Sequence, residues 1–497
     1  MSRSAIVIGA GVAGLSTGCY AQMNGYSTRI VEMHDKPGGL CTAWQRRGYT
    51  VDVCIHWLVG SKPCTEFHKC WQEIGLVQGR EFLDLDEFVR VEGADGRTAI
   101  FYTDLVKLER HLLELSPEDA PAIKELLGDA RRVAKRDMPA GAPVGLAGML
   151  RVMPHMIPFL RPMRKWGKLS IADFCARLKD PLLKEAFAKI RFPDMSALIL
   201  VFTLAWFHAG NAGYPIGGSL PMVRAVEKRF RDLGGEIEYK SRVTSILVED
   251  GRAVGVRLED GKEERADTVI SAADGHATIF DMLGGRYLDD TIRGYYEIFT
   301  PFPPLVFIGL GVARDFTAEP KMVSGGHLHL AEPAQVGPTR VEAVDYRVHN
   351  FDPTLAPAGK TVITASIATE YQYWKELVAD RAGYEAQKRA AADLLITALD
   401  RRYPGLAGQV EMIDVSTPVT FERYTGNWKG SFEGWLPTPA SGSYLTGLRN
   451  TLPGLANFYM VGQWVAPGGG LPSGVITGRQ VVQLMCKRDK KRFLTTV

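Results

Sequence analysis

Several features common in chains of this size are missing from the sequence. Its 497 residues contain no C-x-x-C pair, and the seven cysteines have no spacing typical of metal ligands. No uninterrupted apolar run reaches the roughly 18 to 20 residues that a membrane-spanning helix needs. The patterns G-x-S-x-G, H-E-x-x-H and the P-loop are absent as well. We therefore expect no spanning helix and none of the sites that these patterns mark.

An excess of one charge is also lacking. The 59 basic and 56 acidic residues leave a formal net charge of +3, and both signs are spread along the chain. Nucleic-acid-binding proteins carry a basic patch or stripe, so nucleic acid is excluded as a partner. The odd number of cysteines fits a reducing compartment. The N-terminus runs into an apolar strand without the pattern of an export signal, so a cytoplasmic location is expected.

A glycine-rich turn near the N-terminus lies between predicted regular elements. Residues 4–8 predict a short buried strand, residues 15–24 a helix, and residues 27–31 a second strand. The turn between the first strand and the helix reads Gly9-Ala10-Gly11-Val12-Ala13-Gly14. This order, within about thirty residues, is typical of the unit that begins a dinucleotide-binding domain.

Each glycine of the turn has a separate task. Gly9 permits the tight turn, Gly11 lets the backbone approach a pyrophosphate, and Gly14 allows the helix to pack closely on the strand. The helix N-terminus offers unpaired N–H groups to the anion, and Val12 and Ala13 of the turn are expected to contact the cofactor with these glycines. The sequence therefore predicts a dinucleotide at this turn.

The residues at the end of the second strand and just beyond it indicate which dinucleotide binds. That strand stops at Glu32, which we expect to accept hydrogen bonds from the ribose hydroxyls. The next stretch, Lys36-Pro37-Gly38-Gly39-Leu40-Cys41-Thr42, resembles the second glycine pair of the FAD-binding family that includes amine oxidases and phytoene desaturases. An ordinary glycine turn is the alternative. The resemblance implies FAD, with Gly38, Gly39 and Leu40 along its pyrophosphate and ribityl chain.

A strand, loop and helix near the C-terminus are similar to the closing motif of the same family. Residues 458–461 predict the strand and residues 475–485 the helix, whose N-terminal dipole faces the pyrimidine end of the flavin. Gln463 stands where the family often has an acid, and it can hydrogen-bond without carrying charge. The residues that the resemblance assigns to FAD here are Gly462, Gln463, Gly470, Leu471, Pro472, Gly474 and Val475.

An internal segment, residues 217–274, resembles the family's glycine pair, helix and adenine-side strand, with Val243 as the adenine contact. Within it, residues 253–258 and 266–271 predict two strands of a small antiparallel sheet. The predicted fold is α/β, a Rossmann-like FAD fold of the two-dinucleotide-binding-domain type with an intertwined α+β substrate domain. We expect the FAD-binding domain to comprise residues 1–85, 217–285 and 440–497, and the substrate domain residues 86–216 and 286–439.

The stretch from Tyr49 to Gly60 is more specific. It resembles a segment of retinol saturases and carotenoid isomerases in which an Asp, a small residue, Ile, His and an aromatic lie near the flavin. His56 can donate a hydrogen bond or a proton there, with Trp57 beside it. The alternative is a core histidine bonded to backbone.

Residues 417–430 are similar to the family's segment that re-enters the flavin site. Tyr424 is therefore a third catalytic candidate, after His56 and Trp57, and packing in the core is the alternative for it and for Trp428. His327 and His329 share a predicted strand, but no third ligand lies near them in the sequence. No metal site is therefore expected.

Two apolar stretches bear on the substrate. Residues 138–168 contain five Lys or Arg and no acidic residue, and residues 195–207 are almost wholly apolar. Such stretches suit a greasy substrate entrance or a peripheral membrane contact. The alternative is a lid packed on its own domain.

The resemblance implies hydride and proton transfer between flavin and a carbon–carbon bond of a lipophilic isoprenoid or polyene, in desaturation, saturation or isomerisation. Only one nucleotide fingerprint is present, so the electron donor or acceptor is expected to be a separate partner. A flavin amine or amino-acid oxidase is the first alternative, although the polar or aromatic-caged pocket it needs is not identifiable. A non-catalytic flavin-binding carrier of lipophilic compounds is the second.

Overall fold

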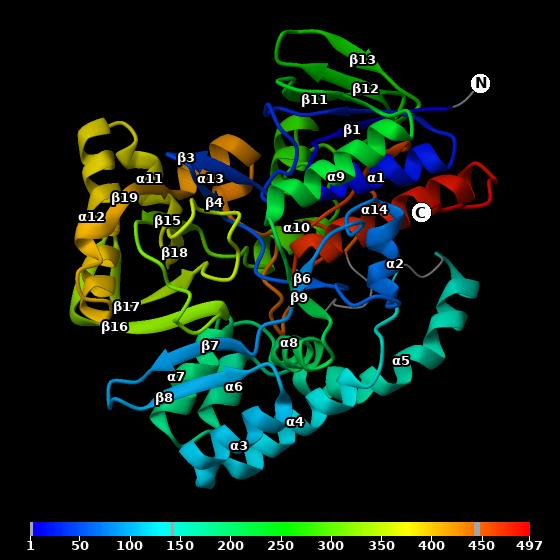
Figure 1. The fold of residues 1–497 in the computed structure, drawn as a ribbon. Coiled ribbons are helices and arrows are strands. Elements are labelled where there is room, and N and C mark those ends of the chain that lie inside the picture. Colours follow the sequence, from blue (N-terminus) through cyan, green and yellow to red (C-terminus); the bar gives the residue numbers. More distant parts are fainter. Residues whose placement is uncertain (1–2, 141–143, 442–447) are drawn as a thin grey trace.

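A computed structural model describes residues 3–140, 144–441 and 448–497, and it contains a parallel sheet whose strand β1 lies in the upper right of Figure 1. Its five strands stand in the order β10-β2-β1-β14-β20 and pair in parallel throughout. They come from the beginning, middle and end of the sequence. Their bounds are β1 Ser4–Ile8, β2 Ser27–Val31, β10 Glu236–Glu238, β14 Thr268–Ser271 and β20 Phe458–Met460. The α/β fold expected from the sequence is confirmed.

Three helices pack together beside this sheet: α1 (Val12–Met23), α9 (Ser219–Asp232) and α14 (Gly470–Arg488) (Figure 1). Glycines allow the helices to approach closely. A Cβ on Gly18 of α1 would lie 2.7 Å from the Phe230 ring, and one on Gly478 of α14 would lie 2.6 Å from a Thr17 oxygen. Both α1 and α14 begin earlier than predicted, at Val12 and Gly470, so each helix includes glycines of the adjoining turn.

The five-stranded parallel sheet is called the nucleotide sheet below. A small antiparallel sheet adjoins it, with strands β11 (Val243–Glu249), β12 (Arg252–Leu258) and β13 (Glu263–Arg265). The predicted pairing of residues 253–258 with 266–271 is wrong. Residues 268–271 instead form β14, the central neighbour of β1. All four of its residues are buried, as in a parallel strand covered on both faces.

A second, seven-stranded sheet has the order β19-β15-β18-β17-β16-β7-β8. Its pairs are antiparallel, except that β16 runs parallel to β7. Helices α11 and α12 pack on it around a core that includes Trp374. The bounds are β7 Glu87–Glu92, β8 Thr98–Tyr102, β15 Leu305–Val312, β16 Met322–Val336, β17 Thr339–Val348, β18 Thr361–Ala368, β19 Val410–Ser416, α11 Tyr371–Leu377 and α12 Arg381–Arg402.

A group of helices closes the lower side of the molecule in Figure 1. Helix α3 ends before Pro117, which lacks a backbone donor, and the Ser116 hydroxyl donates to Asp119 at 2.9 Å just before α4 begins. The apolar stretch near residue 200 forms α8, which is largely buried. The bounds are α3 Leu105–Leu115, α4 Ala120–Ala134, α5 Leu146–Trp166, α6 Ile171–Ala176, α7 Pro181–Ile190 and α8 Leu198–His208.

Shorter elements connect these layers. Strands β3 and β4 form a hairpin, while β5, β9 and β6 form a small sheet. Within the described residues no helix is both long and apolar enough to cross a membrane. The remaining bounds are β3 Ala43–Arg46, β4 Tyr49–Asp52, β5 Leu58–Val59, β6 Phe82–Leu83, β9 Ala212–Pro215, α2 Glu66–Glu73, α10 Asp290–Ile298 and α13 Pro418–Thr425.

Candidate cofactor and substrate site

A cavity of about 1200 Å³ lies where the nucleotide sheet, the second sheet and α8 meet. Its volume exceeds the roughly 300–1000 Å³ usual for a site that holds one small ligand. Gly14 and Val475, two of the residues expected at the cofactor, do not line it and pack inside their helices. The predicted residues that do line it are Gly9, Gly11, Val12, Ala13, Glu32, Gly38, Gly39, Leu40, Val243, Gly462, Gln463, Gly470, Leu471, Pro472, Gly474, His56, Trp57 and Tyr424.

The glycine turn after β1 opens the N-terminus of α1 toward the cavity. Gly9 has a φ of +98°, which favours glycine, and Gly11 caps α1 without any side-chain hydrogen bond. No acidic residue occupies the first turn of the helix. The second glycine motif joins it, because the Gly38 N–H donates to the Ala10 carbonyl at 2.9 Å. The first N–H groups of α1 are therefore free to bind an anion.

Glu32 fastens this turn. One carboxylate oxygen accepts the Ala10 N–H at 2.6 Å and the other accepts the His34 N–H at 2.7 Å. Burial raises the pKa of Glu32, and these two amide donors oppose the rise. The carboxylate lines the cavity at the end of β2, where a ribose hydroxyl can reach its remaining lone pairs.

The N-terminus of α14 lies against that of α1. A Cβ on Gly474 would be 3.2 Å from the Ala13 nitrogen, and one on Gly462 would be 3.2 Å from the Ala13 Cβ. Gly469 caps α14 without a side-chain hydrogen bond. Two helix N-termini thus face one cavity, an arrangement that fits the pyrophosphate and the electron-accepting ring of FAD, and the Glu433 carboxyl accepts the Gly470 N–H at the start of α14.

Asp52 holds the segment that carries His56. It accepts hydrogen bonds from the Ser219 N–H at 2.6 Å, the Ser219 hydroxyl at 2.7 Å and the Cys54 N–H at 2.9 Å. The carboxylate also requires a glycine beside it, because a Cβ on Gly218 would lie 2.4 Å from an Asp52 oxygen. Asp52, the acid of the predicted stretch, is therefore buried, and its hydrogen bonds join this stretch to the start of α9.

His56 faces the cavity. Its ring has no hydrogen bond to any residue that the structure describes, so the alternative of a core histidine bonded to backbone is not what the fold contains. Removal from water lowers the pKa of His56 well below its ordinary value, and the nearby charges of Arg347 and Arg191 add to this effect. The imidazole is therefore neutral at pH 7. Trp57 beside it packs against Phe207, with ring centroids 5.3 Å apart.

Charged residues that no sequence pattern indicated also line the cavity. The Arg191 guanidinium lies 4.4 Å from the centroid of the Trp57 ring, and burial lowers its pKa to about 10. Burial raises the pKa of Glu433 to about 7, against the opposing charge of Arg191. Arg347 donates to the Ile55 carbonyl at 3.0 Å. These residues come from loops and strands far apart in the sequence, so no local signal could have found them.

The third catalytic candidate lies elsewhere on the wall. The Tyr424 ring contacts His34, two residues beyond Glu32, with centroids 5.1 Å apart. Its neighbour Trp428 stacks on His276 at 4.7 Å and does not line the cavity. Tyr424 is therefore positioned beside the segment that carries Glu32.

Beyond His56 and Trp57 the cavity wall becomes apolar. Side chains from α8, from the loop before it, from the second sheet and from two further loops form this part. They are Phe192, Met195, Ile199, Phe202, Trp206, Phe302, Phe307 and Phe432, and Met163 of α5 also reaches the cavity.

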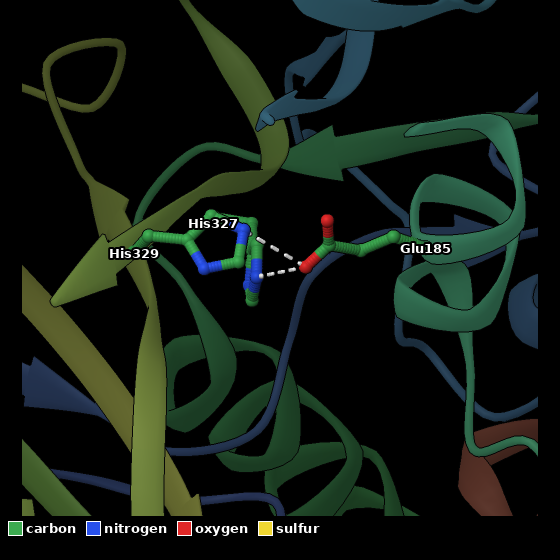
Figure 2. Close-up of side chains that lie close together, drawn as sticks. All are labelled: Glu185, His327 and His329. Carbon is green, nitrogen blue, oxygen red and sulfur yellow. Dashed lines mark hydrogen bonds and ion pairs between the residues drawn. The ribbon is translucent and has the colours of Figure 1, made fainter. Parts of the chain in front are cut away.

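No third ligand lies near His327 and His329 in the sequence, but the fold brings one beside them. Glu185 of α7 lies beside both, as Figure 2 shows. The carboxylate comes from a helix more than a hundred residues earlier in the chain, so sequence distance hid it.

Known proteins share this architecture. The family described as flavin containing amine oxidoreductase matches residues 12–486. A phytoene desaturase (lycopene-forming) of Pseudescherichia vulneris is 25% identical over 506 residues, with 97% of this chain and 99% of the relative covered. A chloroplastic prolycopene isomerase of Daucus carota is 24% identical over 500 residues, covering 95% and 78%. The solved cyclohexylamine oxidase of Brevibacterium oxydans IH-35A has the same fold, with a TM-score of 0.63, 14% identity, and coverage of 99% and 100%.

The family match spans nearly the whole chain, and the two helix N-termini, the glycine turn and Glu32 meet at one cavity that suits the cofactor of that family. The chain belongs to the flavin containing amine oxidoreductases, and it is an FAD-dependent oxidoreductase.

Proposed function

We propose that the protein transfers hydride and a proton between FAD and a carbon–carbon bond of a long, apolar, conjugated substrate of the isoprenoid class. The observation that carries the proposal is the apolar part of the cavity, which begins at His56 and Trp57 and continues along α8. This part of the cavity can hold a lipophilic substrate in addition to the cofactor. The relatives named as a phytoene desaturase and a prolycopene isomerase support this substrate class.

His56 is the residue we assign to proton transfer. FAD supplies the hydride acceptor or donor. In desaturation the neutral imidazole takes a proton from one substrate carbon while hydride leaves the adjacent carbon, and in saturation both steps run in reverse. Trp57 positions the substrate by packing, and Tyr424 is reassigned to the wall near Glu32.

Charge in the cavity argues against an amine substrate. Arg191 and Arg347 both lie in the wall near His56. Glu433, the carboxyl that acts on Arg191, has a pKa of about 7 and is only partly ionised near neutrality, while Asp52 and Asp352 act on Arg347. An ammonium group entering this wall would meet two cations. A neutral hydrocarbon would meet no such penalty.

The substrate is proposed to reach the cavity from a membrane surface along α5. Four apolar side chains of α5 are exposed at helical spacing: Leu150, Met153, Ile157 and Leu160. Basic side chains accompany them, and residues 144–168 include no acid, which suits an anionic lipid surface. Met163 of the same helix lines the cavity. Residues 141–143 of the apolar stretch noted in the sequence lie outside the described residues.

Vesicle sedimentation tests the membrane contact. Leu150→Glu combined with Ile157→Glu is expected to abolish binding to vesicles that contain anionic lipid. Val106→Glu combined with Ile298→Glu, at two exposed positions outside α5, adds the same two charges elsewhere and leaves binding unchanged. Equal binding by all three proteins would refute the contact.

Anaerobic reduction of the FAD-loaded protein tests the activity. We expect the enzyme to convert added phytoene, or polyenes of a mixed extract, into new products. Flavin absorbance and product mass then show whether the reaction is a saturation, an isomerisation or a desaturation. Reoxidation with a two-hydrogen mass gain indicates saturation, and unchanged mass with altered retention indicates isomerisation. Oxidised enzyme bleached by a polyene indicates desaturation, for which a separate electron acceptor must complete the cycle.

Two outcomes would replace the proposal. Bleaching of the oxidised flavin by amines, with no response to polyenes, would establish an amine oxidase. Lipophilic compounds that bind without any change in either flavin state would establish a carrier.

A further inference from the structure

Three side chains from two distant segments meet outside the lining of the cofactor cavity. Glu185 lies on α7, while His327 and His329 lie two residues apart on β16 and therefore share one face of the strand (Figure 2). One oxygen of Glu185 is 3.2 Å from His327 Nε2 and 3.0 Å from His329 Nε2. The three candidate ligand atoms all lie within 4.8 Å of one another.

These separations suit the coordination sphere of a metal ion. Zn²⁺ binds imidazole nitrogen and carboxylate oxygen at about 2.0–2.2 Å in a tetrahedral arrangement, which puts neighbouring ligand atoms about 3.3 Å apart. Two imidazoles and one carboxylate form a ligand set that zinc and other first-row divalent ions accept, with a further position left for water.

His327 also has the outer partner that a metal-bound histidine normally has. Its Nδ1 is 2.6 Å from Asp345 Oδ1, and Asp345 stands directly across from His327 on β17. Nδ1–H donating to this carboxylate leaves the lone pair of Nε2 directed at Glu185. Such a carboxylate fixes the ring orientation and makes the histidine a more basic ligand.

A bound cation would also suit the charges around the three side chains. The 3.2 Å contact between His327 Nε2 and the Glu185 oxygen is a hydrogen bond if both ring nitrogens carry a proton, whereas with one proton, on Nδ1, two lone pairs face each other there and a cation between them removes the repulsion. His329 Nε2 is out of contact with solvent and, although close to the same oxygen, is not aligned for a hydrogen bond. One divalent ion would satisfy all three atoms, and its charge would balance Glu185 and Asp345.

We propose that Glu185, His327 and His329 bind one divalent transition-metal ion, for which Zn²⁺ is the best match. The ion joins α7 to β16 as a structural cross-link. The chain leaves α7 at Arg191, whose guanidinium lies over Trp57, so the cross-link also fixes this part of the cavity wall. The site is independent of the substrate proposed above.

Zinc content tests the site directly. FAD-loaded protein is stripped with a chelator, dialysed, and titrated with zinc sulfate against a chromophoric competitor, and bound zinc is compared with flavin by elemental analysis. One zinc per flavin is expected. Glu185→Gln and His329→Ala should each weaken zinc binding by at least 100-fold, and Asp345→Asn by about 10- to 100-fold.

Glu332→Gln is the matched control, because Glu332 is exposed on the same strand and lies outside the cluster. It should bind zinc as the wild type does. A wild type that takes up no zinc, or variants that keep wild-type affinity, would overturn the proposal. If a variant fails to fold, zinc-edge X-ray absorption of the wild type decides: nitrogen and oxygen ligands at about 2.0–2.1 Å support the site, and sulfur at about 2.3 Å refutes it.

Discussion

Replacing Gly14 by alanine should damage both the fold and the cofactor site, although alanine is the better helix former. A Cβ at position 14 would lie 1.9 Å from the carbonyl oxygen of Gly9, whereas non-bonded contacts settle at about 3.5–4.0 Å. The start of α1 and the glycine turn would have to separate by roughly 1.6 Å. Neither can move freely, because β1 pairs with strands on both sides and α14 packs against α1.

Two opposing effects set the magnitude. Overpacking costs about 1–3 kcal/mol, and an obstacle made of backbone puts Gly14→Ala at the upper end, about 3 kcal/mol. Alanine returns about 1 kcal/mol through helix propensity, so unfolding free energy should fall by about 2 kcal/mol. The displaced turn carries the amides offered to the pyrophosphate, so FAD binding should weaken at least tenfold, about 1.4 kcal/mol.

Urea unfolding of the FAD-free protein and titration of flavin fluorescence measure the two effects. Gly128→Ala in α4 is the control, because no atom lies within 4 Å of the added Cβ. It should stabilise the protein by about 0.4–1 kcal/mol and leave FAD affinity unchanged. A Gly14→Ala protein that is as stable as the wild type and binds FAD equally well would refute the steric argument.

Three further substitutions probe the cavity. His56→Ala should retain FAD yet slow flavin turnover with a polyene by about 10²- to 10⁴-fold, the usual worth of a general base, and unaltered single-turnover rates would remove His56 from the chemistry. Glu32→Gln weakens two hydrogen bonds to the turn, at Ala10 and His34, so the FAD dissociation constant should rise by about tenfold, corresponding to about 1.4 kcal/mol, as measured by fluorescence quenching. The pKa of Glu433 is raised from 4.5 to about 7 in the folded protein. Between these pH values the folded state holds a proton that the unfolded state releases. The contribution of Glu433 to the unfolding free energy should therefore decline as pH rises from about 4.5 to 7. The difference in unfolding free energy between wild type and Glu433→Gln should therefore change across that range, and a constant difference would contradict the assignment.

Local patterns predicted the parts of the fold that local physics decides. The bounds of β1 and β2 match the predicted strands, since short apolar runs next to a glycine turn leave little freedom. The FAD cofactor and the α/β fold are confirmed. Both could be predicted because the glycine turn and Glu32 lie within one continuous stretch of sequence. The roles of individual cofactor residues and the residue limits of the two domains stay predictions.

Features that depend on distant contacts were not predictable. Glu185 joins His327 and His329 only because α7 packs beside the second sheet. Arg191 and Glu433 acquire their altered pKa values from burial by segments remote in the sequence. The strand at 268–271 was assigned to the wrong sheet because an apolar run does not reveal its partner.

The sheet order has a consequence for how the protein is made. At translation rates of about 5–20 residues per second, the 450 positions between Ile8 of β1 and Phe458 of β20 take about 20 to 90 s to synthesise. During the later part of that time β14, whose four residues are all buried in the folded protein, has β1 on one side and nothing on the other. An uncovered strand edge invites pairing with other chains. Helix α14, which supplies the second helix terminus of the cofactor site, emerges only after β20 has covered the edge, so FAD binding comes too late to protect it. Chaperone supply and expression temperature should therefore govern the yield of folded protein more than FAD supply does.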